Sequence, residues 1–287
     1  SGNSVGFMTE KDAAADFKTA MVNNNQWGGP FNANPAPFTE TTIWNVLSEN
    51  GFASDKDWKI YYSDAYLKGH LDHKTSYTYL MFGKLQKLLN PDGAEGFDDP
   101  RYQTIASFYD DAKNGTLPRF AYLEPLYTWE FLFSGIGIHG TDYHPPADIR
   151  GGEGFLRDIY DSLKASPQWS ETLLVVAFDE HGGTFDHVPP PATAIDPGGA
   201  DANQCDFDFK RYGVRVPMLF ISPWVKEHTV IRSGSTDHPF DHSSWLATLL
   251  DWFDLAPDLL GKRTKAAPTF EMVIQDKARG DIDLPAL

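Results

Sequence analysis

The residues of this sequence whose types could do chemistry are carboxylates and imidazoles in four short polar segments. They are Glu124, His144, the group Asp179, Glu180, His181, Asp186 and His187, and the pair Asp241 and His242. Such side chains, without thiolates, suit a hard or borderline divalent cation: oxygen ligands favour Ca²⁺, Mg²⁺ or Mn²⁺, and mixed oxygen and nitrogen ligands favour Zn²⁺ or Fe. Adjacent Asp179 and Glu180 repel each other, and a bound cation removes that cost. We therefore expect a metal site; the alternative is an acidic loop whose carboxylates cap helices and turns.

Several of these residues have structural roles open to them. Glu124 precedes a proline and is as well suited to accept backbone N–H groups as to contact a substrate. Asp241 is a candidate N-cap for the helix that follows it. For His242 the two alternatives are a side chain satisfied within the core and a functional residue. Asp186 and His187 form either a catalytic pair or a locked turn, and we favour the turn. Four other histidines are expected to be solvated or structural: His70, His73, His228 and His238.

The largest polar group must be positioned by the apolar run Thr172–Phe178 that precedes it. Its β-branched and large apolar residues do not alternate with polar ones, which predicts a strand covered on both faces in the centre of a parallel sheet. The carboxyl ends of such strands are where ligands bind. Gly182 and Gly183 allow a tight turn, and Pro189–Pro191 hold the exit extended. This strand end is the predicted site.

Further strands are predicted over 58–62, 119–123 and 215–221, and helices over 41–50, 79–89, 101–114, 153–165 and 243–253. Strands that alternate with helices predict an α/β fold with a mainly parallel central sheet and helices on both faces. The polar segments mostly follow strands, so they should converge on one edge of this sheet. His144 lies in a loop, 127–149, that is too long and polar for a plain connection. We expect one domain over 1–287, with an irregular surface excursion over 1–40.

Composition restricts the function classes. With 40 acidic and 24 basic residues the formal net charge is -16, which disfavours nucleic acid as a partner. No stretch of about 18 uninterrupted apolar residues predicts a transmembrane segment. The single cysteine, Cys205, excludes an internal disulfide framework and a multi-cysteine zinc site. Ser1–Met8 lacks the features of a secretory signal, as a mature chain would.

The segment Phe178–Pro191, FDEHGGTFDHVPPP, resembles the signature of a phosphoesterase family. This family contains bacterial and fungal phospholipases C and acid phosphatases, within the alkaline phosphatase superfamily. Other segments follow in the family's order, so the likeness covers nearly the whole chain: 42–51 with 58–62, 115–118 with 122–125, 144–148 with 152–153, 213–217, 222–224 and 241–244. The resemblance implies an alkaline phosphatase-like three-layer sandwich.

The resemblance implies metal-dependent hydrolysis of a phosphate ester or phospholipid. It assigns Asp179 and Glu180 as ligands of one divalent ion, with Ca, Mn, Zn and Fe all open. His144 would hydrogen-bond phosphoryl oxygens or protonate the leaving group. We expect His181 and His242 to be catalytic as well, and the substrate contacts to come from Glu124 and His187. Such groups would stabilise the negative charge that develops as the ester bond breaks. A secreted or periplasmic location is expected.

The chain departs from the family pattern at its start. The family carries a Glu-Asn metal-binding pair and a Ser or Thr nucleophile just before a Ser-Gly-Thr-Ser-Gly-like stretch, and this chain begins with Ser1–Gly6 of that kind. Glu49-Asn50 does not match in position. We therefore expect the chain to cover the C-terminal two-thirds to three-quarters of the family fold. The phosphoenzyme would form on a Ser or Thr outside it, on an N-terminal polypeptide that is the second chain of a processed enzyme. Ser1 or Ser4 as nucleophile is the alternative.

Two other functions compete with the phosphoesterase interpretation. The same loops could form a non-catalytic module that binds a cation or a sugar, and the chain could be an inactive fragment. Hydrolysis of sulfate esters would need a cysteine motif that becomes formylglycine, and the Asn-Gln-Cys-Asp context of Cys205 does not provide it.

Overall fold

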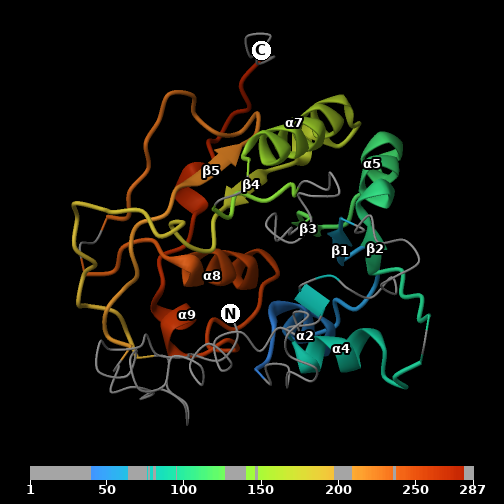
Figure 1. The fold of residues 1–287 in the computed structure, drawn as a ribbon, viewed down its shortest axis with the longest axis horizontal. Helices are drawn as coiled ribbons and strands as arrows, with labels where there is room; N and C mark the ends of the chain where they lie inside the picture. The colour runs from blue at the N-terminus through green and yellow to red at the C-terminus, as the bar shows by residue number, and fades with distance from the viewer. Residues whose placement is uncertain are drawn as a thin grey trace. The chain divides into compact units, whose positions relative to one another are not determined.

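A computed structural model describes residues 40–63, 76, 78–79, 82–94, 96–126, 140–145, 148–196, 209–234 and 237–280 (Figure 1). The predicted excursion over 1–40 falls outside these ranges except for Glu40, as do His70, His73, Cys205, Ser1 and Ser4. The chain divides into two compact units. Unit 1 comprises Ser1–Asp110, Leu117–Phe155 and Asp196–Phe209, and unit 2 comprises Asp111–Thr116, Leu156–Ile195 and Lys210–Leu287.

Unit 1 contains a parallel sheet of three strands in the order β2-β1-β3: β1 is Trp58–Tyr62, β2 Tyr102–Thr104 and β3 Phe120–Glu124. Every residue of β1 is buried, as a central strand requires. The strand predicted over 58–62 is confirmed, and the one over 119–123 lies one residue further along. The helix predicted over 101–114 is wrong in its first part, because 102–104 pair with β1 and helix α5, Ile105–Asn114, begins after them. Pairing with β1 outweighs local helix propensity there.

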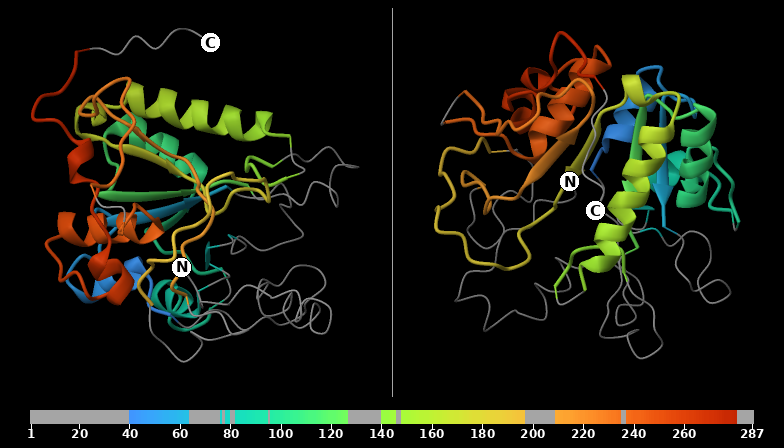
Figure 2. Two further views of the ribbon diagram at one scale, coloured as in Figure 1. Left: turned by 90° about the vertical axis from the view of Figure 1, so that its left-hand side faces the viewer. Right: turned by 90° about the horizontal axis from the view of Figure 1, so that it is seen from above.

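Helices cover both faces of this sheet. Tyr61 lies beside Leu123 in the strand register and Ile60 lies beside Tyr122, so these two pairs point to opposite faces. Phe108 of α5 contacts Tyr61 at a ring-centroid distance of 5.6 Å. On the other face Trp44 of helix α2, Ile43–Glu49, contacts Tyr122 at 5.2 Å. Figure 2 (left) shows α5 on one side of the strands and α2 on the other. The α/β class is therefore confirmed for this unit.

Helix α2 lies within the helix predicted over 41–50 and is capped at its start. The Thr42 side chain accepts the N–H of Asn45, the Asn45 side chain accepts the N–H of Thr42, and Gly51 beyond the last turn has a φ of 95°. Helix α4, Gly83–Leu89, is shorter than the helix predicted over 79–89. The Asn45 side chain donates to the carbonyl oxygen of Lys84 at 3.1 Å, which ties the two helices together.

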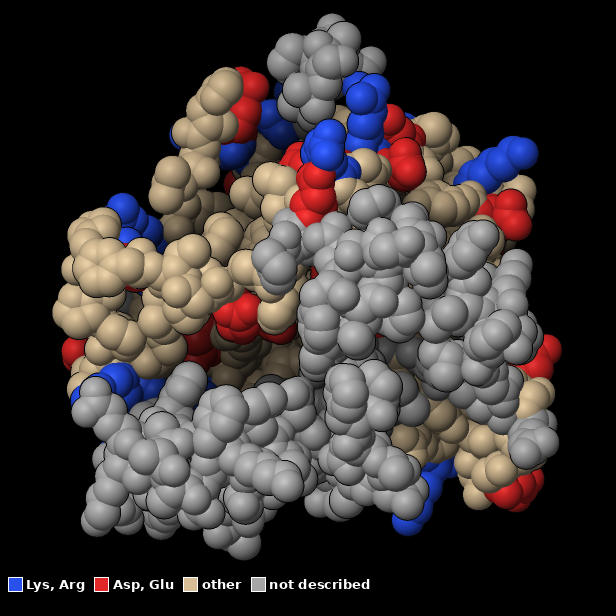
Figure 3. All heavy atoms as spheres, in the orientation of Figure 1, with Lys and Arg blue, Asp and Glu red and all other residues tan. Residues whose placement is uncertain are grey.

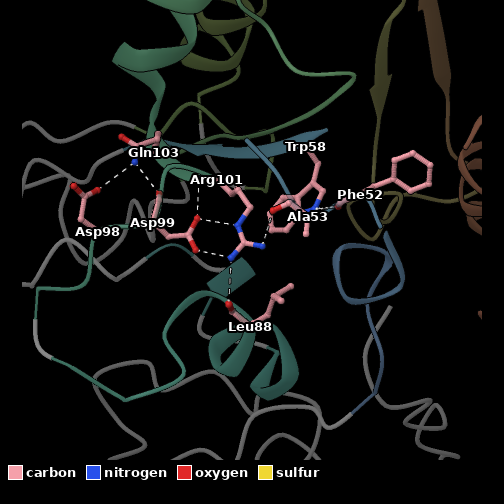
Figure 4. A network of polar contacts seen from close by, with 8 residues as sticks. All are labelled: Phe52, Ala53, Trp58, Leu88, Asp98, Asp99, Arg101 and Gln103. Carbon is pink, nitrogen blue, oxygen red and sulfur yellow. Dashed lines mark hydrogen bonds and ion pairs between the residues drawn. The ribbon is translucent and has the colours of Figure 1, made fainter. Parts of the chain in front are cut away.

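Arg101 joins three parts of unit 1 (Figure 4). Its guanidinium binds the Asp99 carboxylate at 2.6 Å, and it donates to the carbonyl oxygens of Ala53 and Leu88. It also lies 4.9 Å from the ring centroid of Trp58, a fully buried residue. Arg101 and Asp99 keep only 14% and 11% of their side-chain surface exposed, so this ion pair is largely shielded from water.

Unit 2 contains a two-stranded sheet formed by β4, Leu174–Ala177, and β5, Met218–Ile221. The two strands are antiparallel, with Leu174 opposite Ile221 and Ala177 opposite Met218. The prediction that 172–178 is a central strand of a parallel sheet is therefore wrong for the described residues. An apolar run predicts a strand but not its partner or direction. A parallel partner needs a crossover helix, and the described residues between Ala177 and Met218 form none.

Aromatic residues build the core of unit 2. Phe270 packs against Phe220 of β5 and against Phe240, at centroid distances of 4.9 and 4.8 Å. Val225 and Val273 complete this cluster. The remaining elements are α7, Arg150–Ala165, which begins three residues before the predicted 153, α8, His242–Trp252, predicted over 243–253, and three short ones: η2, Trp169–Glu171, α9, Lys262–Ala266, and η4, Glu271–Val273.

Two observations on the described residues bear on partners. Among the described residues, no helix has the length and apolar character needed to cross a bilayer. On the face shown in Figure 3, acidic and basic side chains of the described residues are interspersed, and no continuous basic patch is visible.

Candidate active site

Asp179 and Glu180 follow the end of β4, and both are exposed. Asp179 Oδ1 accepts the N–H of Glu180 at 3.0 Å, and Glu180 Oε2 accepts the N–H of Gly182. Gly182 and Gly183 have φ values of 70° and 74°, a left-handed conformation that favours glycine. The predicted tight turn is thus confirmed, and it presents two neighbouring carboxylates to solvent.

His181 adds an imidazole to this pair, with its Nδ1 atom 3.7 Å from Glu180 Oε2. Two carboxylates and a nearby imidazole provide oxygen and nitrogen donors of the kind that a divalent cation binds. Within the part of the chain that the structure describes, no group of three or more His, Cys, Asp or Glu residues is close enough to hold a metal ion. Metal binding by Asp179 and Glu180 therefore stays a prediction.

His242 is the first residue of α8 and contacts the end of β4. Its Nε2 atom lies 2.8 Å from the carbonyl oxygen of Phe178, the residue before Asp179. A carbonyl oxygen only accepts hydrogen bonds, so Nε2 carries the proton in this contact. In the neutral ring Nδ1 is then the acceptor. This contact brings His242 to the strand end that bears the candidate ligands.

Asp241 is the N-cap of α8, which confirms that interpretation. Its Oδ1 atom accepts the N–H groups of Ser243 and Ser244, at 2.7 and 3.2 Å, and the Ser244 side chain accepts the N–H of Asp241 in return. Burial raises the pKa of Asp241, and the two N–H bonds oppose that shift. The cap fixes where α8 begins and hence where His242 lies.

Asp186 forms a locked turn, as we favoured. It accepts two hydrogen bonds of 2.7 Å from the Arg215 guanidinium and one of 3.0 Å from the N–H of Val188. The bonds from Arg215 hold the pKa of Asp186 far below its ordinary value. His187 lies beside it, with Nδ1 3.7 Å from Asp186 and most of its side chain exposed. Arg215 was not singled out from the sequence, because no spacing signal links residues 29 positions apart.

In unit 1, Glu124 is the last residue of β3 and only 2% exposed. Its Oε2 atom accepts the N–H of Thr78 at 2.9 Å, which is the backbone-binding role considered from the sequence. The negative charge of Glu124 also affects Tyr102. Burial is the main cause that raises the pKa of Tyr102, and the charge of Glu124 adds to this shift. Contact of Glu124 with substrate stays a prediction.

His144 is exposed in the segment 140–145, which packs on the first turn of α7. A Cβ atom at Gly151 would lie 2.1 Å from the carbonyl oxygen of Gly140, and one at Gly152 would lie 2.4 Å from the Tyr143 ring. The Tyr143 hydroxyl donates to Glu153 at 2.6 Å. These two glycines therefore permit the close approach that fixes the chain just before His144.

The structure thus brings together some of the predicted site residues and leaves others in separate segments. Asp179, Glu180 and His181 follow the end of β4, and His242 binds the carbonyl oxygen of Phe178 there. Asp186 and His187 belong to the same loop as the carboxylates. Glu124 and His144 belong to unit 1.

Comparison with known proteins shows which family this chain resembles. The model of the phosphoesterase family matches residues 15–256. Non-specific phospholipase C3 of Arabidopsis thaliana is 34% identical over 260 residues, which are 89% of this chain and 44% of that protein. Non-specific phospholipase C4 of the same plant is 39% identical over 186 residues, 63% of this chain and 34% of the relative. The non-hemolytic phospholipase C of Burkholderia pseudomallei is 30% identical over 149 residues, 47% and 19% of the two chains.

The chain belongs to the phosphoesterase family, because the family model matches well over half of it. The family resemblance found in the sequence is confirmed. The chain spans less than half of the length of each of these three relatives.

Proposed function

We propose that the protein containing this chain is a metal-dependent phosphoric ester hydrolase of the phospholipase C or acid phosphatase type. The observation that carries the proposal is the exposed pair Asp179 and Glu180 at the end of β4, with His242 bound to the adjacent Phe178. Membership of the phosphoesterase family and the phospholipase C names of its relatives support it. An alkaline phosphatase-like sandwich is part of the same proposal.

Asp179 and Glu180 would hold one divalent ion together with donors from elsewhere in the protein. When bound, such an ion supplies Lewis-acid stabilisation of charge on phosphoryl oxygens. The neighbouring side chains then have distinct roles. His242 presents an imidazole whose protonated nitrogen is fixed by Phe178, and His181 adjoins Glu180 at 3.7 Å. His181 is suited to donate to phosphoryl oxygens or to the leaving group, and His242, whose Nε2 proton is used on Phe178, is suited to accept a proton at Nδ1 and pass it on.

Exposed His144 and His187 complete the proposed set of imidazoles, His144 as a proton donor and His187 as a contact for the substrate. Glu124, at the carboxyl end of β3, would contact the substrate. The nucleophile would be a Ser or Thr outside these 287 residues. An N-terminal polypeptide of the same protein and a secreted or periplasmic location remain parts of the proposal.

The test compares the full-length protein with its D179N and E180Q variants. Hydrolysis of p-nitrophenyl phosphate and p-nitrophenylphosphorylcholine is measured with and without a chelator, alongside metal content by mass spectrometry. Loss of outer-shell partners already costs roughly 10–100-fold in activity, so we expect each ligand variant to lose about 100-fold or more. Metal content should fall with activity.

The matched control is D161N, because Asp161 is an exposed carboxylate paired with Arg157 on α7. This variant should keep its rate and its metal. A full-length protein that turns over neither ester would support a non-catalytic binding module instead. Undiminished activity of D179N and E180Q would remove these residues from the metal site.

A further inference from the structure

Phe185 is the most exposed large hydrophobic residue among those described, with 92% of its surface accessible. Val230 follows at 83%. Burying apolar surface stabilises by roughly 25 cal/mol per Å², and a phenylalanine side chain is among the largest apolar groups. A fully exposed ring lacks this stabilisation in the isolated protein. A ligand or surface that covers the ring therefore binds more favourably by the free energy of burying it.

The exposure of Phe185 is imposed by contacts on both sides of it. Before it, the Thr184 hydroxyl donates to the carbonyl oxygen of His181 at 2.9 Å. After it, Asp186 is bound by Arg215 and by the N–H of Val188. The ring therefore projects from a turn that is tied down at both ends, and a rigidly presented side chain loses little conformational entropy on binding.

The same turn carries the candidate metal ligands. Thr184 is bound to His181, and His181 lies 3.7 Å from Glu180, so Phe185 belongs to one short hydrogen-bonded loop with the carboxylates. Exposed Pro189 and Pro191 continue the loop beyond it. A group that approaches the carboxylates with an apolar portion attached would find the Phe185 ring on the same loop.

We propose that Phe185 inserts into the apolar region of a phospholipid surface and so determines the preference of the site for lipid substrates packed in a membrane. This inference rests on the proposed function, which it extends to the physical state of the substrate. Asp179 and Glu180 on this loop, and the net charge of -16, repel anionic lipids. The surface that fits is therefore electrically neutral, as a phosphatidylcholine bilayer is.

Binding is tested first, without turnover. The full-length protein carrying E180Q, as a hydrolysis-impaired background, is sedimented with sucrose-loaded phosphatidylcholine vesicles, with and without F185A or F185W. Loss of the ring should lower the partition coefficient roughly tenfold or more, which corresponds to at least about 1.4 kcal/mol of binding free energy. F185W should restore binding. The control is M272A, which removes an exposed apolar side chain from η4.

Turnover is tested second, as the ratio of the rate on phosphatidylcholine vesicles to the rate on soluble p-nitrophenylphosphorylcholine. F185A should lower this ratio several-fold, and M272A should leave it unchanged. Equal partitioning and an equal ratio in F185A would overturn the inference. A lower melting temperature of F185A would overturn it too, because the ring would then be packed against protein. If vesicles bind through Phe185 but neither ester is hydrolysed, the lipid contact stands and the proposed function fails.

Discussion

The Nε2 atom of His242 lies 2.8 Å from the main-chain carbonyl oxygen of Phe178, although 64 residues separate the two in sequence. This hydrogen bond joins the first residue of α8 to the end of β4. Because Phe178 precedes Asp179, it sets the imidazole beside the candidate metal ligands. It also determines which ring nitrogen carries the proton, a property that decides what the other nitrogen can do.

Replacement of His242 separates proton transfer from positioning. Glutamine can still donate a hydrogen bond to Phe178, whereas alanine cannot. We expect H242A to lower the free energy of unfolding by about 1 kcal/mol and H242Q to change it little. If the imidazole transfers protons, both variants should lose at least about 100-fold in rate. Chemical denaturation and ester hydrolysis measure the two effects. An H242Q variant with wild-type rate would show that His242 only positions the end of β4.

The ion pair of Asp186 and Arg215 should stabilise the loop in a pH-dependent way. The folded protein lowers the pKa of Asp186 below its ordinary value of 3.8, so the stabilisation is complete above that value and is lost as the pH falls through the folded pKa. The melting temperature of R215Q should therefore lie below that of the wild type by a constant amount from pH 7 to 5. The difference should shrink below about pH 4.

R157Q is the control for this pH series, since Arg157 forms an exposed ion pair with Asp161 on α7. Exposed pairs contribute about 0–1 kcal/mol, so its melting temperature should stay near the wild-type value throughout. A difference in melting temperature between R215Q and the wild type that widens as the pH falls from 4 to 3 would contradict stabilisation by ionised Asp186.

Removal of Arg101 should destabilise unit 1. R101M leaves the shielded Asp99 carboxylate without its partner and removes the cation from the face of Trp58. We expect the free energy of unfolding to fall by about 2–4 kcal/mol, below the full cost of breaking a completely buried pair. Urea denaturation measures it, with R157M on the surface of α7 expected to change stability by less than about 0.5 kcal/mol. A loss below about 1 kcal/mol for R101M would mean that water replaces the guanidinium.

Two variants of Asp241, the N-cap of α8, separate the contribution of its hydrogen bonds to stability from the contribution of its charge. D241A removes the acceptor for the N–H groups of Ser243 and Ser244 and should cost about 1 kcal/mol. D241N keeps an acceptor. Since burial raises the pKa of Asp241, the folded state favours its neutral form, and this contribution is present at low pH and lost as the pH rises through the folded pKa. D241N should therefore match or exceed the wild type at pH 7, and the wild type should gain relative to D241N towards pH 4. Equal losses in D241N and D241A would contradict this.

The elements with strong local signals were predicted well. Trp58–Tyr62 is a strand with the predicted bounds, and α2 lies within the predicted range 41–50, because caps and short apolar runs are encoded by adjacent residues. β2 was missed, since Tyr102–Thr104 becomes a strand only through pairing with β1. The direction of β4 was wrong for the same reason: pairing is a property of two segments distant in sequence.

The candidate site divides in the same way. The sequence alone determined the family, the acidic and imidazole side chains after the apolar run 172–178, and the glycine turn that exposes Asp179 and Glu180, because these depend on residue types at short spacing. Only the tertiary structure decided that His242 binds Phe178, that Arg215 locks Asp186, and that Glu124 is buried against Thr78. These contacts join residues 29 to 64 positions apart, and no local pattern encodes which distant partner a polar side chain will meet.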